Sequence, residues 1–178
     1  VPQDVVDRIV ARTDGIPLFV EELTKSLVES GLGASDENIP TTLQASLLAR
    51  LDRLPPGAKA VAQLGAVIGR EFQYDLLSRV ASRINTNLSD VLEQLVQSEL
   101  VFRSASTTDA TFTFKHALVQ DAAYDSLLRS HRHEIHREIA ESLLDKLGTG
   151  QLVEPEILAH HYTEAELNEQ AIKYWQHA

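Results

Sequence analysis

The chain has 178 residues, 43% hydrophobic and 24% charged, which is typical of a globular protein rather than a disordered chain. It has no run of about 18 uncharged apolar residues that could cross a membrane, and its lack of cysteine excludes disulfides and thiolate chemistry and fits the reducing cytoplasm, where we expect it. The formal net charge of −10 repels phosphate backbones, so we do not expect general affinity for nucleic acids.

The first part of the chain, residues 1–54, is predicted to be a helical segment of three helices. Apolar residues at helical spacing indicate a short helix over 5–10, and Gly15 follows its end. Pro17 suits the first position of the next helix, where a missing N–H costs nothing, and it favours an extended Ile16. Gly15-Ile16-Pro17 is therefore interpreted as a rigid corner between two helices.

The helix after this corner is predicted to bury one apolar stripe and to end at Gly31. The stripe consists of Leu18, Phe19, Leu23 and Leu27. Glu21 and Glu22 are assigned to the first turns, where the helix dipole favours carboxylates. A polar loop follows, and Pro40 is expected to begin a third helix that ends at Leu54.

The second part, residues 55–116, begins at the helix-breaking run Pro55-Pro56-Gly57. Helical periodicity predicts three helices, over 58–68, 74–84 and 88–98. The period then changes to two in the runs 100–103 and 111–115, which flank a polar loop and indicate a β-hairpin. Three helices followed by a hairpin is the order of a winged-helix domain, in which the apolar face of the hairpin closes the helical core.

The third part, residues 117–178, is predicted to be helical again. One helix covers 117–128, a second is capped by Ser130 and ends near Gly148, and a third begins at Pro155. A break at Asn168 leads to a last short helix. Two short helices joined tightly indicate the start of a helical-repeat array of tetratricopeptide-like type. The predicted fold class is mainly α, with one β-hairpin.

Motifs for catalysis or metal binding are not evident in the sequence. There is no G-x-x-x-x-G-K-[ST] run, so the chain supplies no phosphate-binding loop and is not expected to be an enzyme by itself. The histidines of 131–136 do not fit the H-E-x-x-H zinc motif, because position 137 is arginine. His133 and His136 share a helix face without an evident third ligand. We predict no metal and interpret His131 and His133 as solvated, with His136 and His161 beside apolar stripes.

Two segments resemble a known family when they are taken together. Gly15-Ile16-Pro17-Leu18-Phe19-Val20-Glu21-Glu22-Leu23 resembles the Gly-x-Pro motif in the helical lid of STAND-class signalling ATPases. More narrowly, it is similar to the AAA-like ATPase modules associated with adenylate or guanylate cyclases and LuxR-type regulators. Phe114-Lys115-His116-Ala117-Leu118-Val119-Gln120-Asp121 resembles the end of their winged-helix domain. The resemblance covers nearly the whole chain, so 1–54 would be a lid segment, 55–116 the winged helix, and 117–178 a linker with the first repeats.

The resemblance implies a regulatory role in a larger, nucleotide-gated protein. In this family a P-loop domain binds ATP or ADP with Mg²⁺, and the lid and winged helix fold over the nucleotide. The residues that match the nucleotide-contacting positions are Gly15, Ile16 and Pro17, toward adenine, and His116, toward the β-phosphate. Ala117 replaces a charged residue that often follows the histidine. The chain begins Val-Pro-Gln and has no methionine, so we interpret it as a piece that lacks the N-terminal P-loop domain and binds no cofactor alone.

The resemblance leaves two alternatives open. One is a winged-helix transcriptional regulator that binds DNA, although residues 87–97, which would enter the major groove, carry Asp90 and Glu93 and no basic residue. The other is a helical adaptor that binds a protein effector through 117–178 without nucleotide. The effector, the upstream signal, the fused output domain and the oligomeric state are not encoded in any motif that we identify.

Overall fold

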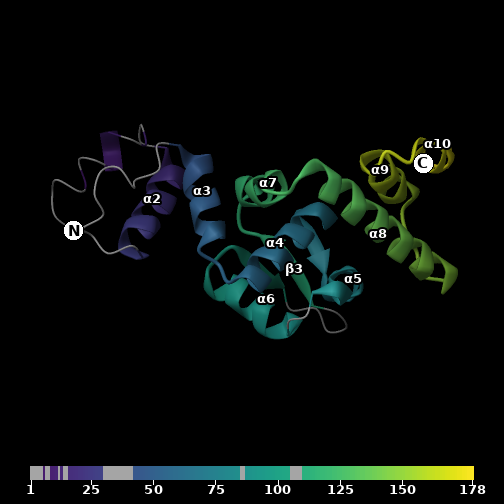
Figure 1. Cartoon of the computed structure of the whole chain (residues 1–178), viewed down its shortest axis with the longest axis horizontal. Helices are drawn as coiled ribbons and strands as arrows, with labels where there is room; N and C mark the ends of the chain where they lie inside the picture. Colours follow the sequence, from purple (N-terminus) through teal and green to yellow (C-terminus); the bar gives the residue numbers. More distant parts are fainter. Residues whose placement is uncertain are drawn as a thin grey trace. The chain divides into compact units, whose positions relative to one another are not determined.

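A computed structural model of the protein describes residues 6, 9–11, 13, 16–29, 42–84, 87–104 and 110–178. These residues fall into two compact units, Val1–Pro55 and Pro56–Ala178 (Figure 1). The fold is mainly helical with one small antiparallel sheet, which confirms the predicted class at that level.

The first unit is built on two helices, α2 (Pro17–Glu29) and α3 (Leu43–Asp52). Helix α2 begins at Pro17 as predicted, and it buries Phe19, Leu23 and Leu27 against Ile9, while Leu18 is only half-buried. Helix α3 begins at Leu43 because the Thr42 side chain accepts a hydrogen bond from Ala45 N at 3.1 Å. The predicted features at Gly15, Gly31 and Pro40 lie outside the described residues.

The second unit begins with α4 (Pro56–Ile68), against which three further elements pack. These are β1 (Glu71–Gln73), α5 (Tyr74–Val80) with its short 3-10 extension η2 (Ala81–Arg83), and α6 (Leu88–Gln97). The hairpin follows as β2 (Val101–Ser104) and β3 (Thr111–Phe114), close to the predicted positions. All pairings are antiparallel and the strand order is β1-β3-β2, so β3 is the central strand.

Strand β1 was not predicted from the sequence. It holds the side chain of Phe72, which is 2% exposed and lies against Phe112 and Phe114 of β3 at centroid distances of 5.9 and 5.6 Å. Gly65 of α4 permits this packing, because a Cβ at that position would lie 2.8 Å from Phe72 Cε1. The segment between the first two helices of this unit therefore completes the sheet and the core.

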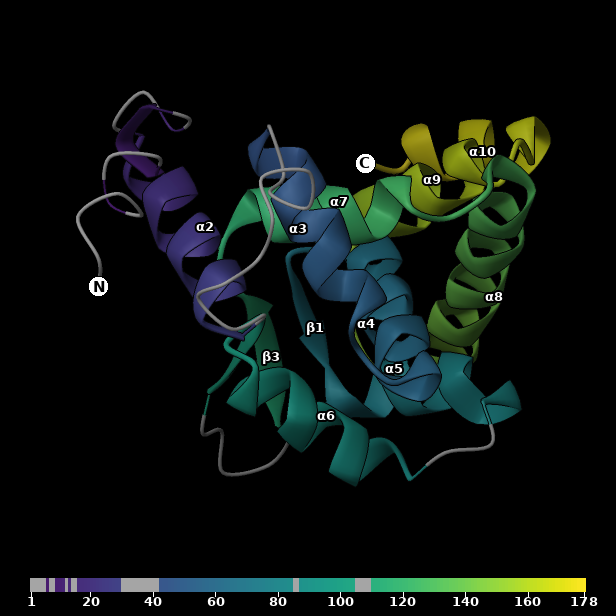
Figure 2. The same ribbon diagram turned by 60° about the vertical axis from the view of Figure 1, so that its left-hand side comes forward.

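The rest of the second unit is α7 (Ala117–Asp125), α8 (Arg129–Gly148), α9 (Pro155–Glu164) and α10 (Asn168–Trp175). Helix α8 packs along α4 and α5, and α9 packs against both α8 and α10 (Figure 2). The prediction that Ser130 caps α8 is wrong: the capping position is Leu128, whose side chain makes no capping bond. None of the described helices combines the length and the apolarity that crossing a membrane would need.

Candidate functional site

The predicted nucleotide-contacting residues belong to both units. Ile16 and Pro17 are exposed in the first unit, and Gly15 lies outside the described residues. Ile16 N–H donates to Thr13 O at 2.9 Å, and its carbonyl accepts from Val20 N at 2.9 Å. The corner before α2 is therefore held by local backbone hydrogen bonds and leaves the Ile16 side chain 53% exposed.

His116 belongs to the second unit, where it follows β3 and occupies the capping position of α7. Its carbonyl accepts from Val119 N at 3.0 Å, whereas its side chain makes no capping bond. The imidazole Nε2 is buried, and among the described residues it has no hydrogen-bond partner. Most buried polar atoms have a hydrogen-bond partner, so this nitrogen is unusual among the described side chains.

A buried polar network that the sequence did not indicate joins α7, α8 and α9. His136 of α8 and His161 of α9 are 1% and 2% exposed, and their Nδ1 atoms lie 2.8 Å apart. On its other side, His136 Nε2 lies 3.1 Å from the hydroxyl of Tyr124, which in turn donates to Glu164 Oε2 at 3.4 Å. A helix junction is thus held by four polar side chains in series.

One proton arrangement uses every contact of this network. His161 Nδ1–H donates to His136 Nδ1, His136 Nε2–H donates to the Tyr124 oxygen, and the Tyr124 hydroxyl donates to Glu164. Both imidazoles are neutral in this arrangement. Burial is the main reason that the pKa of His136 falls to about 4 and that of His161 to about 3. Burial also raises the pKa of Tyr124.

His133 and His136, which were predicted to share a helix face, have different partners in the structure. His133 is half-buried, and its Nδ1 lies 3.7 Å from Glu166 Oε2, whereas His136 points toward His161. The interpretation of His133 as solvated is therefore only partly right. His136 and His161 are buried beside apolar residues of α8 and α9, and they also contact each other. Within the described ranges, no group of three or more histidine and carboxylate side chains is arranged to hold a metal.

A cleft of about 1150 Å³ lies between the β1–α5 segment and the α8–α9 segment of the second unit. All three residues of β1 line it, together with apolar side chains from α8, α9 and the loop between them. The ammonium of Lys146 lies 2.9 Å from Asp75 Oδ2 at its wall, and this ion pair is the main reason that the pKa of Asp75 is lowered. His161 connects the cleft to the histidine network.

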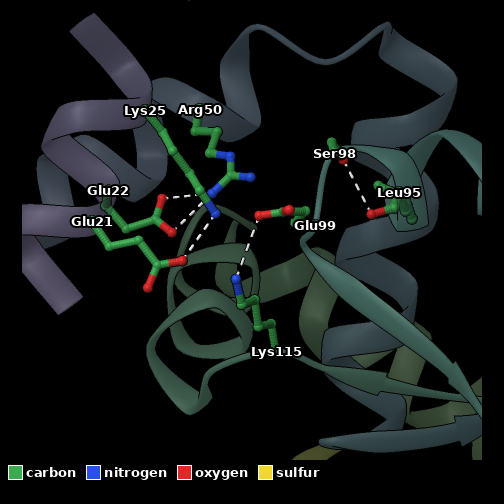
Figure 3. A network of polar contacts seen from close by, with 8 residues as sticks. All are labelled: Glu21, Glu22, Lys25, Arg50, Leu95, Ser98, Glu99 and Lys115. Carbon is green, nitrogen blue, oxygen red and sulfur yellow. Dashed lines mark hydrogen bonds and ion pairs between the residues drawn. The ribbon is translucent and has the colours of Figure 1, made fainter. Parts of the chain in front are cut away.

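Each unit also contains ion pairs that fix local geometry (Figure 3). In the first unit, Arg50 Nη1 donates to both carboxylate oxygens of Glu22, at 2.9 and 2.6 Å, and both side chains are buried. Glu21 and Glu22 lie in the second turn of α2, since the first turn contains no acidic residue, and each pairs with a cation. In the second unit, Lys115 lies 3.4 Å from Glu99, which has a φ of 54° in the turn before β2.

In a comparison with known proteins, the sequence of the chain matches part of a longer protein. No family model matches it. An uncharacterized protein from Rhizobium meliloti (strain 1021) is 25% identical over 177 residues, which is 95% of this chain and 17% of that protein. The chain therefore spans about a sixth of the relative, and the relative's name gives no activity.

Proposed function

We propose that this chain is the regulatory part of a nucleotide-gated signalling ATPase of the STAND class. In this proposal it transmits the ATP or ADP state of a separate P-loop domain to a protein effector and has no catalytic activity of its own. The observation that carries the proposal is the buried His116 Nε2, which has no partner within the described part of the chain. An imidazole nitrogen in that position can donate to a phosphate oxygen.

The topology of the second unit supports a winged-helix domain in this role. Helices α4, α5 and α6 precede the β2–β3 hairpin, and β1 adds the third strand beside β3. His116 lies two residues after the end of β3, near the start of the segment 114–121 that resembles the family. Its position is fixed on one side by the sheet and on the other by the first turn of α7, so a ligand bound there would be linked to both.

The last two helices support the proposed repeat arm. Helices α9 and α10 pack together, with Tyr162 and Tyr174 stacked at a centroid distance of 5.6 Å. Ile157, Ile172 and Trp175 nevertheless remain exposed, at 42%, 57% and 51%. A further helical pair or an effector would bury these apolar side chains.

The DNA-binding alternative receives less support from the second unit. Helix α6 buries Val91, Leu92 and Leu95 and exposes Asp90, Glu93, Gln94 and Gln97. Its exposed face therefore carries two carboxylates and no cation to contact phosphates, so non-specific binding would lack its usual electrostatic source. The adaptor alternative shares the exposed α9 and α10 surface with the main proposal and differs from it only in the need for nucleotide.

The decisive experiment measures ADP affinity in the full-length protein by calorimetry. Replacing His116 by alanine should weaken ADP binding roughly ten- to a hundredfold, the value of a hydrogen bond to a charged group. His131→Ala is the matched control, because His131 is exposed on α8. Equal ADP affinity in both variants would contradict the proposed role of His116 as a nucleotide sensor. Absence of nucleotide binding by the full-length protein would favour the alternative of a protein-binding adaptor.

A further inference from the structure

The open edge of β1 forms one wall of the cleft in the second unit. Phe114 N–H donates to Arg70 O, and Tyr74 N–H donates to Ala110 O, both at 2.9 Å. With Phe72 opposite Phe112, the backbone groups of residues 70, 72 and 74 face β3. Because consecutive residues of a strand point these groups to opposite sides, the N–H groups of Glu71 and Gln73 face away from β3.

Other features of the cleft match an extended chain. Glu71, Phe72 and Gln73 all line it, and in the described part of the chain no strand pairs with this edge. Its volume, about 1150 Å³, exceeds the range of roughly 300–1000 Å³ that is usual for small-molecule sites. The apolar side chains that line it are Ile68, Leu76, Leu143, Leu152, Val153 and Ile157. Leu152 is fully exposed, at 103%.

The charge of the cleft favours a bound peptide with basic side chains. Its ionised groups are the carboxylates of Glu71, Asp75 and Glu154 and the ammonium of Lys146. Because Lys146 is matched by Asp75 at 2.9 Å, Glu71 and Glu154 give the cleft a net negative charge. An extended peptide points alternate side chains to opposite sides, so one set can contact the apolar wall while the other meets these carboxylates.

We propose that this cleft binds an extended peptide segment with alternating apolar and basic side chains, which pairs with β1 as an additional strand. The N–H groups of Glu71 and Gln73 would donate to carbonyl groups of the peptide, as in other cases of strand addition to a sheet edge. This inference does not depend on nucleotide binding or on the role of His116.

The first experiment uses the 178-residue chain and a capped synthetic peptide, Lys-Val-Lys-Val-Lys-Val-Lys, followed by NMR-detected amide exchange. The expected result is slower exchange of the Glu71 and Gln73 amides when the peptide is present, with no such change for a Glu-Val peptide of the same length. Equal binding of the two peptides, or protection confined to residues outside the cleft, would overturn the proposal. A concentration-dependent dimer that protects both amides without peptide would overturn the choice of occupant.

Substitution of Gln73 by proline tests the strand pairing itself. Gln73 has a φ of −86°, close to the value that proline imposes, and its N–H does not serve the pairing with β3. Gln73→Pro should weaken binding of the lysine peptide about five- to tenfold, as expected for one lost hydrogen bond. Glu93→Gln on the exposed face of α6 is the control and should leave binding unchanged. Unchanged affinity in a folded Gln73→Pro protein would overturn the proposal.

A charge reversal gives an independent test if Gln73→Pro fails to fold. Glu71 and Glu154 are both exposed, so replacing both by lysine should preserve the fold. The double variant should prefer the Glu-Val peptide over the Lys-Val peptide, reversing the order found for the original chain. An unchanged preference would place the bound peptide elsewhere and overturn the proposal.

Discussion

His136 and His161 face each other through their Nδ1 atoms, 2.8 Å apart, at the junction of α8 and α9. Two protonated imidazoles would each present a hydrogen at this contact, so the pair requires that at least one Nδ1 be unprotonated. Burial keeps both rings neutral near pH 7 by lowering the pKa values to about 4 and about 3. The junction is therefore built on a contact that acid disrupts.

We expect the second unit to lose stability as the pH falls from about 6.5 toward 4. A solvated histidine has an ordinary pKa of 6.5, so the unfolded chain takes up protons in this range while folded His136 and His161 stay neutral. Stability from this pair is complete above the unfolded pKa and decreases as the pH falls toward the folded pKa values. Urea unfolding followed at several pH values measures the slope.

A variant of His161 separates this effect from the titration of carboxylates. Asparagine can place an amide group near the position of Nδ1 but does not titrate. Between pH 6.5 and 5, above the range in which most carboxylates titrate, His161→Asn should show a smaller loss of stability per pH unit than the original chain. Identical slopes in the two proteins would show that this pair does not control the acid sensitivity.

In the first unit, we expect the Glu22–Arg50 pair to be sensitive to the loss of one partner. Glu22 and Arg50 side chains are 1% and 8% exposed. Glu22→Ala leaves a buried guanidinium without its carboxylate, and such a change costs about 3–5 kcal/mol. Hydrogen exchange of the α2 and α3 amides should therefore increase strongly in this variant.

The neighbouring pair Glu21–Lys25 provides the control for that experiment. Its atoms are also 2.9 Å apart, but its side chains are 39% and 28% exposed. Glu21→Ala should therefore cost less than about 1 kcal/mol. Similar exchange rates in the Glu21 and Glu22 variants would mean that burial does not determine the importance of these pairs.

The long helices and the hairpin could be predicted because their signals are local. The apolar period of α6 and the alternation in Thr111–Phe114 are complete within each segment. Strand β1 has only three residues and one buried side chain, and it is a strand only because it pairs with β3, some forty residues later. A signal that depends on a distant partner is not visible in a short window of sequence.

The polar contacts were missed for a related reason. His136 and His161 are 25 residues apart, and only the packing of α8 against α9 brings their rings together. The local sequence shows Glu22 soon after Pro17, so its role was predicted to be a favourable interaction with the helix dipole. Its partner Arg50 is 28 residues away and could not be recognised from that window. The nucleotide-contacting roles of Ile16, Pro17 and His116 stay predictions, since they rest on the resemblance.

The Asp75–Lys146 pair should stabilise the packing of α5 against α8. The Lys146 side chain is 10% exposed, and its ammonium lies 2.9 Å from Asp75. Asp75→Asn removes the charge that compensates this ammonium and should cost about 1–2 kcal/mol of unfolding free energy at neutral pH. Arg79→Ala removes a longer and more exposed contact of Asp75, at 3.4 Å, and should cost clearly less. An equal cost for both variants in urea unfolding would contradict this.

The contact of Gly65 with Phe72 gives a steric test of the sheet. A Cβ at position 65 would lie 2.8 and 2.9 Å from Cε1 and Cζ of Phe72, whose ring is buried against β3. Alanine there would push the ring away and should destabilise the second unit by about 1–3 kcal/mol, although alanine favours helix. Gly148→Ala is the matched control: a Cβ at the end of α8 meets nothing within 4 Å, so this change should be neutral or slightly stabilising. Thermal unfolding compares the two, and a Gly65→Ala protein as stable as Gly148→Ala would show that β1 is not held against α4 through Phe72.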